Sequence, residues 1–315
     1  MNDTRHTLPF HIVDVFAVEP LTGNPLAVVD GGTDLTLDLF QRIAREFNQS
    51  ETTFVLPSTR PEADWRLRSF TATGVEVFGA GGHNSLGAWW WLAQSGRLAL
   101  AGNATVFHQE IGGRGGRVLP VTILRAGGQL AGVVMEQEAP VAGRQLEDLA
   151  RLATSLGLNV ADLAVDRVPC QVVSTGAAHL MVPIRDRDAV DRIQPDAKAL
   201  FALLDSVGGE GCYVFSLDPR HTDAFAYARF FNPTVGIWED PATGTAAGPL
   251  AAHLVAHGLA KSGQMMTVEQ GTAMGRTSLI QVEVLANTVK VSGRGVVVAS
   301  GQLTLPSSEP GVLQI

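Results

Sequence analysis

The chain has 315 residues, of which 45% are hydrophobic and 17% are charged, so it can bury a core and is not disordered. Its net charge is −8, and no basic run is dense enough to follow a phosphate backbone. We therefore expect no nucleic-acid partner, and the length allows two ordinary domains.

The first part of the chain alternates strand and helix patterns. The expected elements are strands at 11–17, 26–29, 52–56 and 64–71, a turn at 22–25 and a helix at 36–47. Apolar residues recur at helical spacing in the helix, and Asp34 or Thr36 can cap its start. Glycine and asparagine supply the backbone freedom that the turn requires.

A second series of elements follows and resembles the first. Its expected elements are helices at 145–156 and 196–207 and strands at 171–175, 179–184, 211–216 and 224–231. A shift of 161 residues places Arg68, Phe70, Thr73, Gly87 and Leu98 on Arg229, Phe231, Thr234, Gly248 and Leu259. In each copy a strand ending in an aromatic residue leads into a Gly-rich loop and then an apolar helix. Hairpin turns at Ala126–Gly127 and Ala286–Asn287 also correspond, so the order of elements predicts a duplicated fold.

The helices expected at 84–95 and 246–257 are apolar nearly all round, which predicts that each is buried on every side. The expected fold class is α+β, with two pseudo-symmetric domains, each a strongly bent, mostly antiparallel, barrel-like sheet around one central helix. The first domain would comprise residues 1–137 plus about 297–315, and the second 138–296.

Each of these helices begins in a loop of small residues, Gly79–His83 or Asp240–Thr245. Free N–H groups at a helix N-terminus bind anions, and small residues allow close approach, so a small carboxylate is the expected ligand. The alternative is that these glycines serve only tight packing. Neither loop has the spacing of a dinucleotide fingerprint or a P-loop.

Candidate catalytic residues lie beside these loops. Glu51 enters an apolar strand, which is costly for a carboxylate unless it has partners or a function. His83 ends the first loop, and Asp240 and Thr245 bound the second. The alternatives are an exposed glutamate at a strand start and, for Asp240, a helix N-cap, which could coexist with catalysis.

Other chemistries lack support in the sequence. His253 and His257 are four residues apart, but position 254 is leucine and no third metal ligand is evident. No G-x-S-x-G motif of a serine hydrolase occurs. We therefore expect neither a metal nor an organic cofactor.

The compartment can also be predicted. The first eight residues are polar and do not resemble a signal peptide, and no apolar run reaches the roughly 20 residues that span a bilayer. The two cysteines, Cys170 and Cys212, are expected to be buried and cannot form a disulfide framework. A cytoplasmic protein without a membrane partner is expected.

Several motifs together resemble one known family. They are Val13–Phe16 with Gly23–Pro25, Ser50–Phe54, Gly82–His83, Glu239–Ala246, and Glu269–Gly271 with Gly275–Arg276. In this order they resemble the PhzF-like, or phenazine-biosynthesis-like, family from about residue 10 to residue 300. Thr245 stands where serine is usual, Ala72 replaces the proline of the usual F-T-P, and the loop before His83 is at least one residue longer.

The resemblance implies the diaminopimelate-epimerase-like fold, an active site in the cleft between the two domains, a homodimer and a role in biosynthesis. In the phenazine isomerase of the family, a glutamate moves a proton within a cyclic dihydro-hydroxyanthranilate, and that glutamate matches Glu51. The supporting residues match His83, Asp240 and Thr245. Asn24, Gly82 and Gly244 are expected to help bind the substrate.

The sequence therefore predicts a cofactor-free isomerase that moves a proton within a small cyclic or amino carboxylic acid. Three alternatives remain open. They are a racemase or epimerase with acid/base groups on opposite faces of the substrate, a dehydratase or lyase of a hydroxy acid that also uses Glu51, and a binding protein without catalysis.

Overall fold

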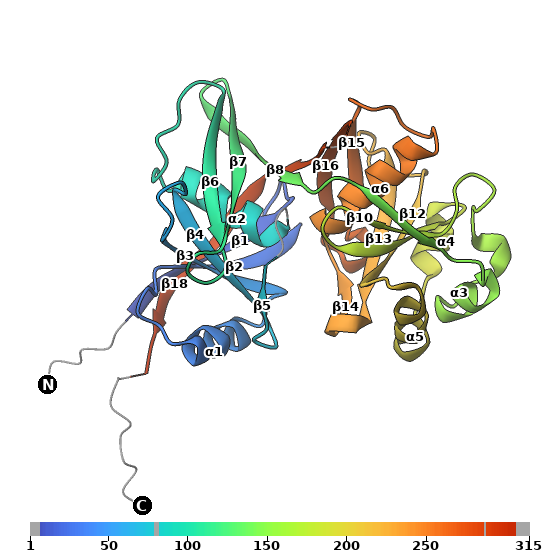
Figure 1. Ribbon diagram of the computed structural model, residues 1–315, viewed down its shortest axis with the longest axis horizontal. Helices are drawn as coiled ribbons and strands as arrows, with labels where there is room; N and C mark the ends of the chain where they lie inside the picture. Colours follow the sequence, from blue (N-terminus) through green and yellow to red (C-terminus); the bar gives the residue numbers. More distant parts are fainter. Residues whose placement is uncertain (1–6, 79–81, 287, 307–315) are drawn as a thin grey trace, which may run out of the picture.

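The computed structural model describes residues 7–78, 82–286 and 288–306. Gly79, Ala80 and Gly81 of the first predicted loop and Asn287 of the second hairpin turn lie outside the described residues, as do the ends of the first predicted domain. Figure 1 shows two groups of elements side by side, one built from residues 7–137 and the other from residues 138–293. We call these groups the first half and the second half.

The protein is α+β, and its strands form mixed sheets. The first half comprises β1 (Thr7–Val15), β2 (Asn24–Asp30), α1 (Leu37–Phe47), β3 (Glu51–Pro57), β4 (Trp65–Thr71), β5 (Glu76–Val77), α2 (His83–Gln94), β6 (Ala104–Ile111), β7 (Arg117–Ala126) and β8 (Gln129–Gln137). The second comprises β9 (Val141–Gln145), α3 (Leu149–Ser155), β10 (Gln171–Ser174), β11 (Ala178–Pro183), α4 (Arg187–Arg192), α5 (Ala197–Val207), β12 (Gly211–Ser216), β13 (Ala226–Asn232), β14 (Ile237–Asp240), α6 (Gly244–Ala256), β15 (Met265–Gln270), β16 (Ser278–Leu285) and β17 (Thr288–Gly293). The last strand is β18 (Gly295–Thr304).

Strand pairing repeats between the halves. In the first half β2 and β3 are parallel, β3–β4 and β4–β5 are antiparallel, β4 and β6 are parallel, and β6–β7 and β7–β8 are antiparallel. The second half repeats this series with β11, β12, β13, β14, β15, β16 and β17. The duplicated order predicted from the sequence is therefore present in the backbone.

Two strands cross between the halves. Strand β8 pairs with β17, and the chain then continues into β9, which pairs with β10 of the second half. In return β18 follows β17 and pairs with β1 of the first half. Figure 1 shows β18, in red, lying among the blue and cyan elements. Each half is thus completed by a strand that follows the other half in the chain.

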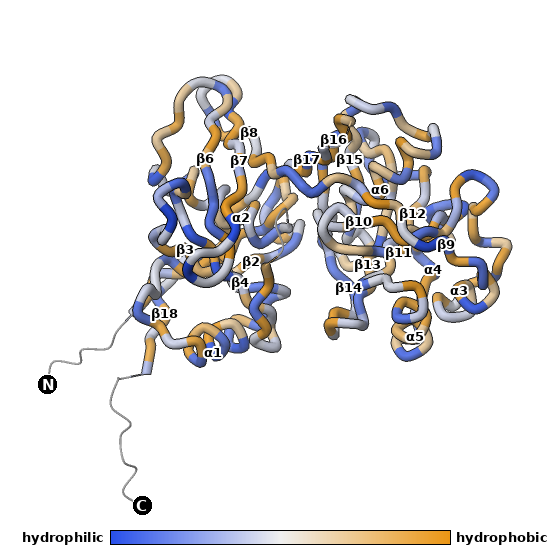
Figure 2. The backbone as a smooth tube through the Cα atoms, in the orientation of Figure 1, coloured by the Kyte–Doolittle hydropathy of each residue, from blue (hydrophilic) through white to orange (hydrophobic). Residues whose placement is uncertain are grey.

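The two central helices are buried, as predicted. Residues 83–92 of α2 are all buried, and most of α6 is buried as well. Figure 2 shows mainly hydrophobic residues along both helices. Gly87 and Gly248 permit close packing, because an added Cβ would lie 2.6 Å from Val15 Cγ2 in the first case and 1.8 Å from Gln137 Oε1 in the second.

One predicted helix was wrong at its start. The expected span was 145–156, but Gln145 is the last residue of β9 and the helix begins at Leu149, where Asp148 caps it. Gln145 pairs with Gln171 across the sheet, and this long-range pairing outweighs local helix propensity. Helix α4 was not predicted from the sequence.

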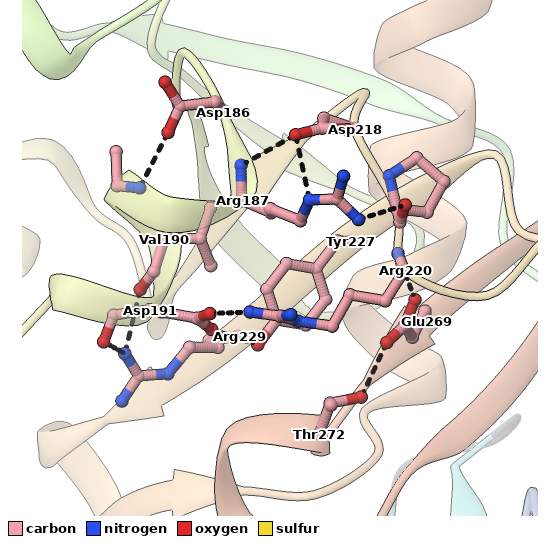
Figure 3. Close-up of polar contacts among 12 residues, drawn as sticks. Asp186, Arg187, Val190, Asp191, Asp218, Arg220, Tyr227, Arg229, Glu269 and Thr272 are labelled. Atoms are coloured by element: carbon pink, nitrogen blue, oxygen red, sulfur yellow. Dashed lines mark hydrogen bonds and ion pairs between the residues drawn. The ribbon is translucent and has the colours of Figure 1, made fainter.

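Each half contains a largely buried arginine–glutamate ion pair at a corresponding place. Arg68 binds both carboxylate oxygens of Glu76 at 2.7 Å, and Arg229 binds those of Glu239 at 2.8 and 2.9 Å. Arg229 also donates to the carbonyl oxygens of Val190 and Ile193 and, more distantly, of Asp191. Figure 3 shows the Arg229 guanidinium against helix α4, which carries Val190 and Asp191.

We predict that Arg229→Met destabilises the protein more than Arg68→Met. Loss of Arg229 leaves the buried Glu239 carboxylate and its neighbouring carbonyls without their donor, which typically costs about 3–5 kcal/mol. The Arg68–Glu76 pair is more exposed, with 16% exposure of each side chain against 9% and 10%. Urea unfolding of both variants measures the difference, and equal losses would contradict the prediction.

Candidate active site

Glu51 and His83 meet at the start of α2. Glu51 is the first residue of β3 and His83 the first of α2, and their Oε2 and Nε2 atoms lie 3.0 Å apart. The alignment does not meet hydrogen-bond geometry, so neither atom has a hydrogen-bond partner among the described residues. The side chains are 18% and 8% exposed, so Glu51 is not the exposed strand-start glutamate of the alternative interpretation.

Asp240 lies at the end of β14 and faces the same site. Its Oδ1 accepts hydrogen bonds from Asn24 Nδ2 at 2.8 Å and from Ser50 Oγ at 3.4 Å, both from the first half. Its Oδ2 accepts from Thr243 Oγ1 at 2.6 Å. Because Ser50 precedes Glu51, the carboxyl groups of the two halves approach each other here.

The N-cap alternative for Asp240 was wrong. Thr243 occupies the N-cap position of α6, and its hydroxyl donates to Asp240 instead of accepting from the helix. Helix α6 therefore begins at Gly244, and Thr245 is its second residue rather than the end of a loop. The Asp240 carboxylate is directed toward the first half by Asn24.

The N-termini of α2 and α6 are close together. A Cβ on Gly82, the N-cap of α2, would lie 3.9 Å from Thr245 Cγ2. No described side chain caps either helix, whereas α1, α3, α4 and α5 are capped by Thr36, Asp148, Asp186 and Asp196. The N-termini of α2 and α6 therefore meet between the halves. In the described residues no side chain accepts a hydrogen bond from the first-turn N–H groups of either helix, and this arrangement favours a bound anion.

Burial changes the acidity of all three groups. It raises the pKa of Glu51 to about 7. It raises the pKa of Asp240 to about 6, and the charge of Glu51 adds to the rise, while His83 and the hydrogen bonds from Thr243 and Asn24 oppose it. Burial lowers the pKa of His83, which Asp240 partly offsets. A neutral imidazole therefore lies beside a carboxyl group that can gain or lose a proton near neutral pH.

Sequence reasoning missed several supporting residues. Gln270 donates to the Asp240 carbonyl oxygen at 2.7 Å and accepts from Tyr213 and the Thr243 N–H. Gln137 donates to the Gly244 carbonyl oxygen at 2.9 Å. Gln270 lies within the Glu269–Gly271 motif, so the sequence could have identified it as a candidate. Nothing local distinguished Gln137 or Tyr213, because only strand pairing brings them to α6.

Other candidates lie elsewhere. Cys170 and Cys212 are buried, as predicted, and burial raises the pKa of both thiols, that of Cys170 to about 12. His253 Nε2 lies 3.0 Å from the Pro169 carbonyl oxygen, and His257 Nδ1 lies 2.9 Å from that of His253. Among the residues that the structure describes, no three His, Cys, Asp or Glu side chains are grouped as metal ligands. No helix in the described ranges is long and apolar enough to cross a membrane.

Residues 13–301 match the PhzC-PhzF family, whose members are described as phenazine biosynthesis-like proteins. The chain belongs to this family. It is 33% identical to the trans-2,3-dihydro-3-hydroxyanthranilate isomerase of Pseudomonas aeruginosa, over 93% of this chain and 98% of that one. It is 34% identical to an uncharacterized isomerase of Clostridium acetobutylicum, over 93% and 97%. This phenazine biosynthesis-like protein is thus an isomerase.

A solved structure of the family has the same fold. The crystal structure of the Bacillus anthracis phenazine biosynthesis protein, PhzF family, matches with a TM-score of 0.85 and 27% identity, over 95% of this chain and 100% of that one. The similarity extends over both halves, so this phenazine biosynthesis-like isomerase shares the whole architecture and not one lobe alone.

We predict that Glu51→Gln stabilises the folded protein at high pH. The folded pKa of Glu51, about 7, exceeds its ordinary value of 4.5, so wild-type stability falls relative to the amide variant as pH rises from 4.5 through 7. The gain should reach about 3 kcal/mol above pH 7 and vanish near pH 4, since each pKa unit corresponds to about 1.4 kcal/mol.

Urea unfolding at several pH values tests this expectation. The matched control is Glu46→Gln, because Glu46 is exposed on α1. If the difference in unfolding free energy between the wild type and the Glu51→Gln variant stayed constant from pH 4 to pH 8, the Glu51 carboxyl would not be desolvated.

Proposed function

We propose that this isomerase moves a proton within a small cyclic or amino carboxylic acid by general acid–base catalysis through Glu51. The observation that carries the proposal is the Glu51 carboxyl, with a pKa of about 7, lying 3.0 Å from His83 at an α2 N-terminus without a described side-chain cap. A carboxyl whose pKa is near the working pH can both take and return a proton. The substrate class follows the name of the Pseudomonas aeruginosa relative.

In the proposed mechanism, Glu51 takes a proton from an activated C–H bond and returns it to another atom on the same face of the substrate. The substrate carboxylate is held by N–H groups near Gly82 and His83 and near Gly244 and Thr245. These groups stay in place as negative charge develops, which is the useful form of electrostatic stabilisation. The closeness of the two helix ends supports this binding mode.

Asp240 and His83 would tune and orient the proton carrier. Ionisation of Asp240 disfavours ionisation of Glu51, so the two carboxyl groups together favour one shared proton near neutral pH. The neutral His83 ring can donate to one carboxylate or accept from one carboxylic acid. Asn24 would hold Asp240 in place from the first half.

A single proton carrier also agrees with the broken symmetry of the halves. Thr52 pairs with Phe70, and Cys212 pairs with Phe231, which is the repeat partner of Phe70. The position equivalent to Glu51 is therefore Gly211, which has no side chain to act as a second base. An epimerase with paired cysteines gains no support, because Cys170 and Cys212 are buried thiols with raised pKa values.

The two halves would act as barrel-like domains that close over the substrate, with boundaries near residues 137 and 297. The strand pairing supports that division, because β9, which follows β8 of the first half, pairs with β10 of the second half, and β18, which follows β17 of the second half, pairs with β1 of the first. We further propose a homodimer, which light scattering of the purified protein would test. A monomeric mass at micromolar concentration would contradict it.

We predict that Glu51→Gln keeps the fold and ligand binding but reduces turnover by about 10²- to 10⁴-fold, the usual contribution of a general acid–base group. The amide keeps the shape of the carboxyl and cannot carry the proton. The assay follows trans-2,3-dihydro-3-hydroxyanthranilate and related small acids by NMR in heavy water. Asp240→Asn should cost less, because Asp240 tunes and orients.

The product distinguishes the alternatives. Isomerisation gives a product with the substrate's formula apart from exchanged deuterium, dehydration loses one water, and epimerisation returns the same skeleton with deuterium at the inverted carbon. If the Glu51→Gln variant turned over the substrate at the wild-type rate, Glu51 would have no role in the mechanism. Binding without any turnover by the wild-type protein would favour a binding protein.

A second prediction concerns the helix ends. Crystals soaked in sulfate or a carboxylate buffer should show an anion between the N-termini of α2 and α6, near His83 and Thr245. The N-terminus of α5 is the internal control, because the Asp196 carboxylate already caps it and should exclude an anion. Density at α5 and none at α2 and α6 would contradict the proposed substrate site.

A further inference from the structure

The segment between β1 and β2 is held in a strained conformation beside the active site. Phe16 and Leu21 have φ of 59° and 67°, and they are two of the four non-glycine residues with positive φ in the described chain. Gly23 has φ of +67°, and an added Cβ would lie 2.4 Å from the Val15 carbonyl oxygen. Such conformations persist only where surrounding contacts determine them, and they often occur at functional sites.

Arg276 of the second half supplies these contacts. Its Nε donates to the Gly23 carbonyl oxygen at 2.8 Å, and its Nη2 donates to the Thr22 carbonyl oxygen at 2.9 Å and to Asp14 Oδ1 at 2.7 Å. Asp14 Oδ2 accepts from the Leu21 N–H at 2.7 Å. The Arg276–Asp14 pair therefore fixes the turn on both sides and joins the two halves.

The fixed turn positions Asn24 at the active site. Asn24 is fully buried, and its Nδ2 donates to Asp240 Oδ1 at 2.8 Å and to the Ala242 carbonyl oxygen at 3.0 Å. Its Oδ1 has no hydrogen-bond partner among the described residues. Both hydrogen bonds of the Asn24 side chain among the described residues thus go to the Asp240–Ala242 segment. The position of Asn24 relative to that segment depends on the backbone of the turn.

The backbone of Arg276 rests on the same loop. An added Cβ on Gly271 would lie 2.5 Å from the carbonyl oxygens of both Arg276 and Pro241. The Arg276 N–H donates to the Gly271 carbonyl oxygen at 3.0 Å, and Ser278 Oγ donates to that of Pro241 at 2.8 Å. Arg276 thus stands between the strained turn and the segment that follows Asp240.

We propose that Arg276 is a positioning residue for the reaction: with Asp14 it sets the Thr22–Asn24 turn and, through Asn24, the Asp240 carboxyl. This inference rests on the proposed function for its catalytic consequence, but its structural part does not. Arg68, the first-half counterpart of Arg229, forms a bidentate ion pair with Glu76 and makes no hydrogen bond to a candidate catalytic residue among the described residues, so it serves as a control for the loss of an arginine ion pair.

Arginine suits this role better than lysine. The guanidinium donates to three acceptors in different directions, Asp14 and the carbonyl oxygens of Thr22 and Gly23. A lysine keeps the positive charge but cannot present the same planar fork. Arg276→Lys therefore removes the geometry while leaving the long-range charge at Asp240 nearly unchanged.

The first test measures the pKa of Asp240 by carboxyl-carbon NMR in the ligand-free protein. Asn24→Ala removes a hydrogen bond that favours the carboxylate, so the pKa should rise by about one unit. Arg276→Lys should give a similar rise, and the double variant should give no further rise. The titratable groups that face Asp240, namely His83, Glu51 and Tyr213, remain in all variants.

An unchanged Asp240 pKa in Arg276→Lys, or additive rises in the double variant, would overturn the proposal. Asp14→Asn provides a second variant if Arg276→Lys folds poorly, because the amide can still accept from the Leu21 N–H while losing its charge. That variant should shift the Asp240 pKa in the same direction. None of these measurements needs a substrate, so they are independent of the proposed reaction.

The second test uses turnover of trans-2,3-dihydro-3-hydroxyanthranilate. Arg276→Lys should reduce kcat, by up to about a hundredfold for a misplacement near 1 Å, with little change in KM. The matched control, Arg68→Lys, should leave kcat unchanged at a similar loss of thermal stability. Equal effects of the two variants on kcat would assign Arg276 a merely structural role. If the wild type turns over neither this acid nor the related small acids, the proposed function fails, while the NMR result still decides the positioning role.

Discussion

The structure depends on the burial of two helix N-termini against each other. Among the α-helices of the described chain, α2 and α6 have no side-chain cap, and both begin where the halves meet. Backbone N–H groups at a buried helix end require a partner, and water is largely excluded there. The same low-dielectric surroundings raise the pKa values of Glu51 and Asp240. The proposed anion binding and the proposed proton transfer would therefore have one physical origin.

Duplication provides the scaffold, and departures from it provide the chemistry. The halves share strand pairing, a central helix and a bidentate arginine–glutamate pair next to that helix's entry loop. They differ where a reaction would need them to differ. Glu51 in the first half corresponds to glycine in the second, and the second half supplies Asp240 from β14. A symmetric scaffold thus encloses an asymmetric set of acids.

The candidate active site is shared between segments far apart in the chain. Asn24 reaches Asp240 across 216 residues of sequence, and Arg276 holds the turn before Asn24 from a point still further along. These contacts cross between the halves, so the relative placement of the halves and the geometry of the carboxyl groups are coupled. A shift of one half would alter both the anion site and the surroundings of Glu51.

The sequence by itself determined the burial of the two central helices, because their apolar residues leave no polar face. It also determined the duplicated order of elements and the family, and it limited the cap of α1 to Asp34 or Thr36, of which the structure shows Thr36. Tertiary structure decided the strand identity of Gln145 and the N-cap of α6 at Thr243 rather than Asp240. It also decided the contacts of Glu51 with His83 and of Asn24 with Asp240. Local patterns report which surfaces must be buried, whereas the partners of a buried polar group are set by strand pairing between distant segments, which has no local signal.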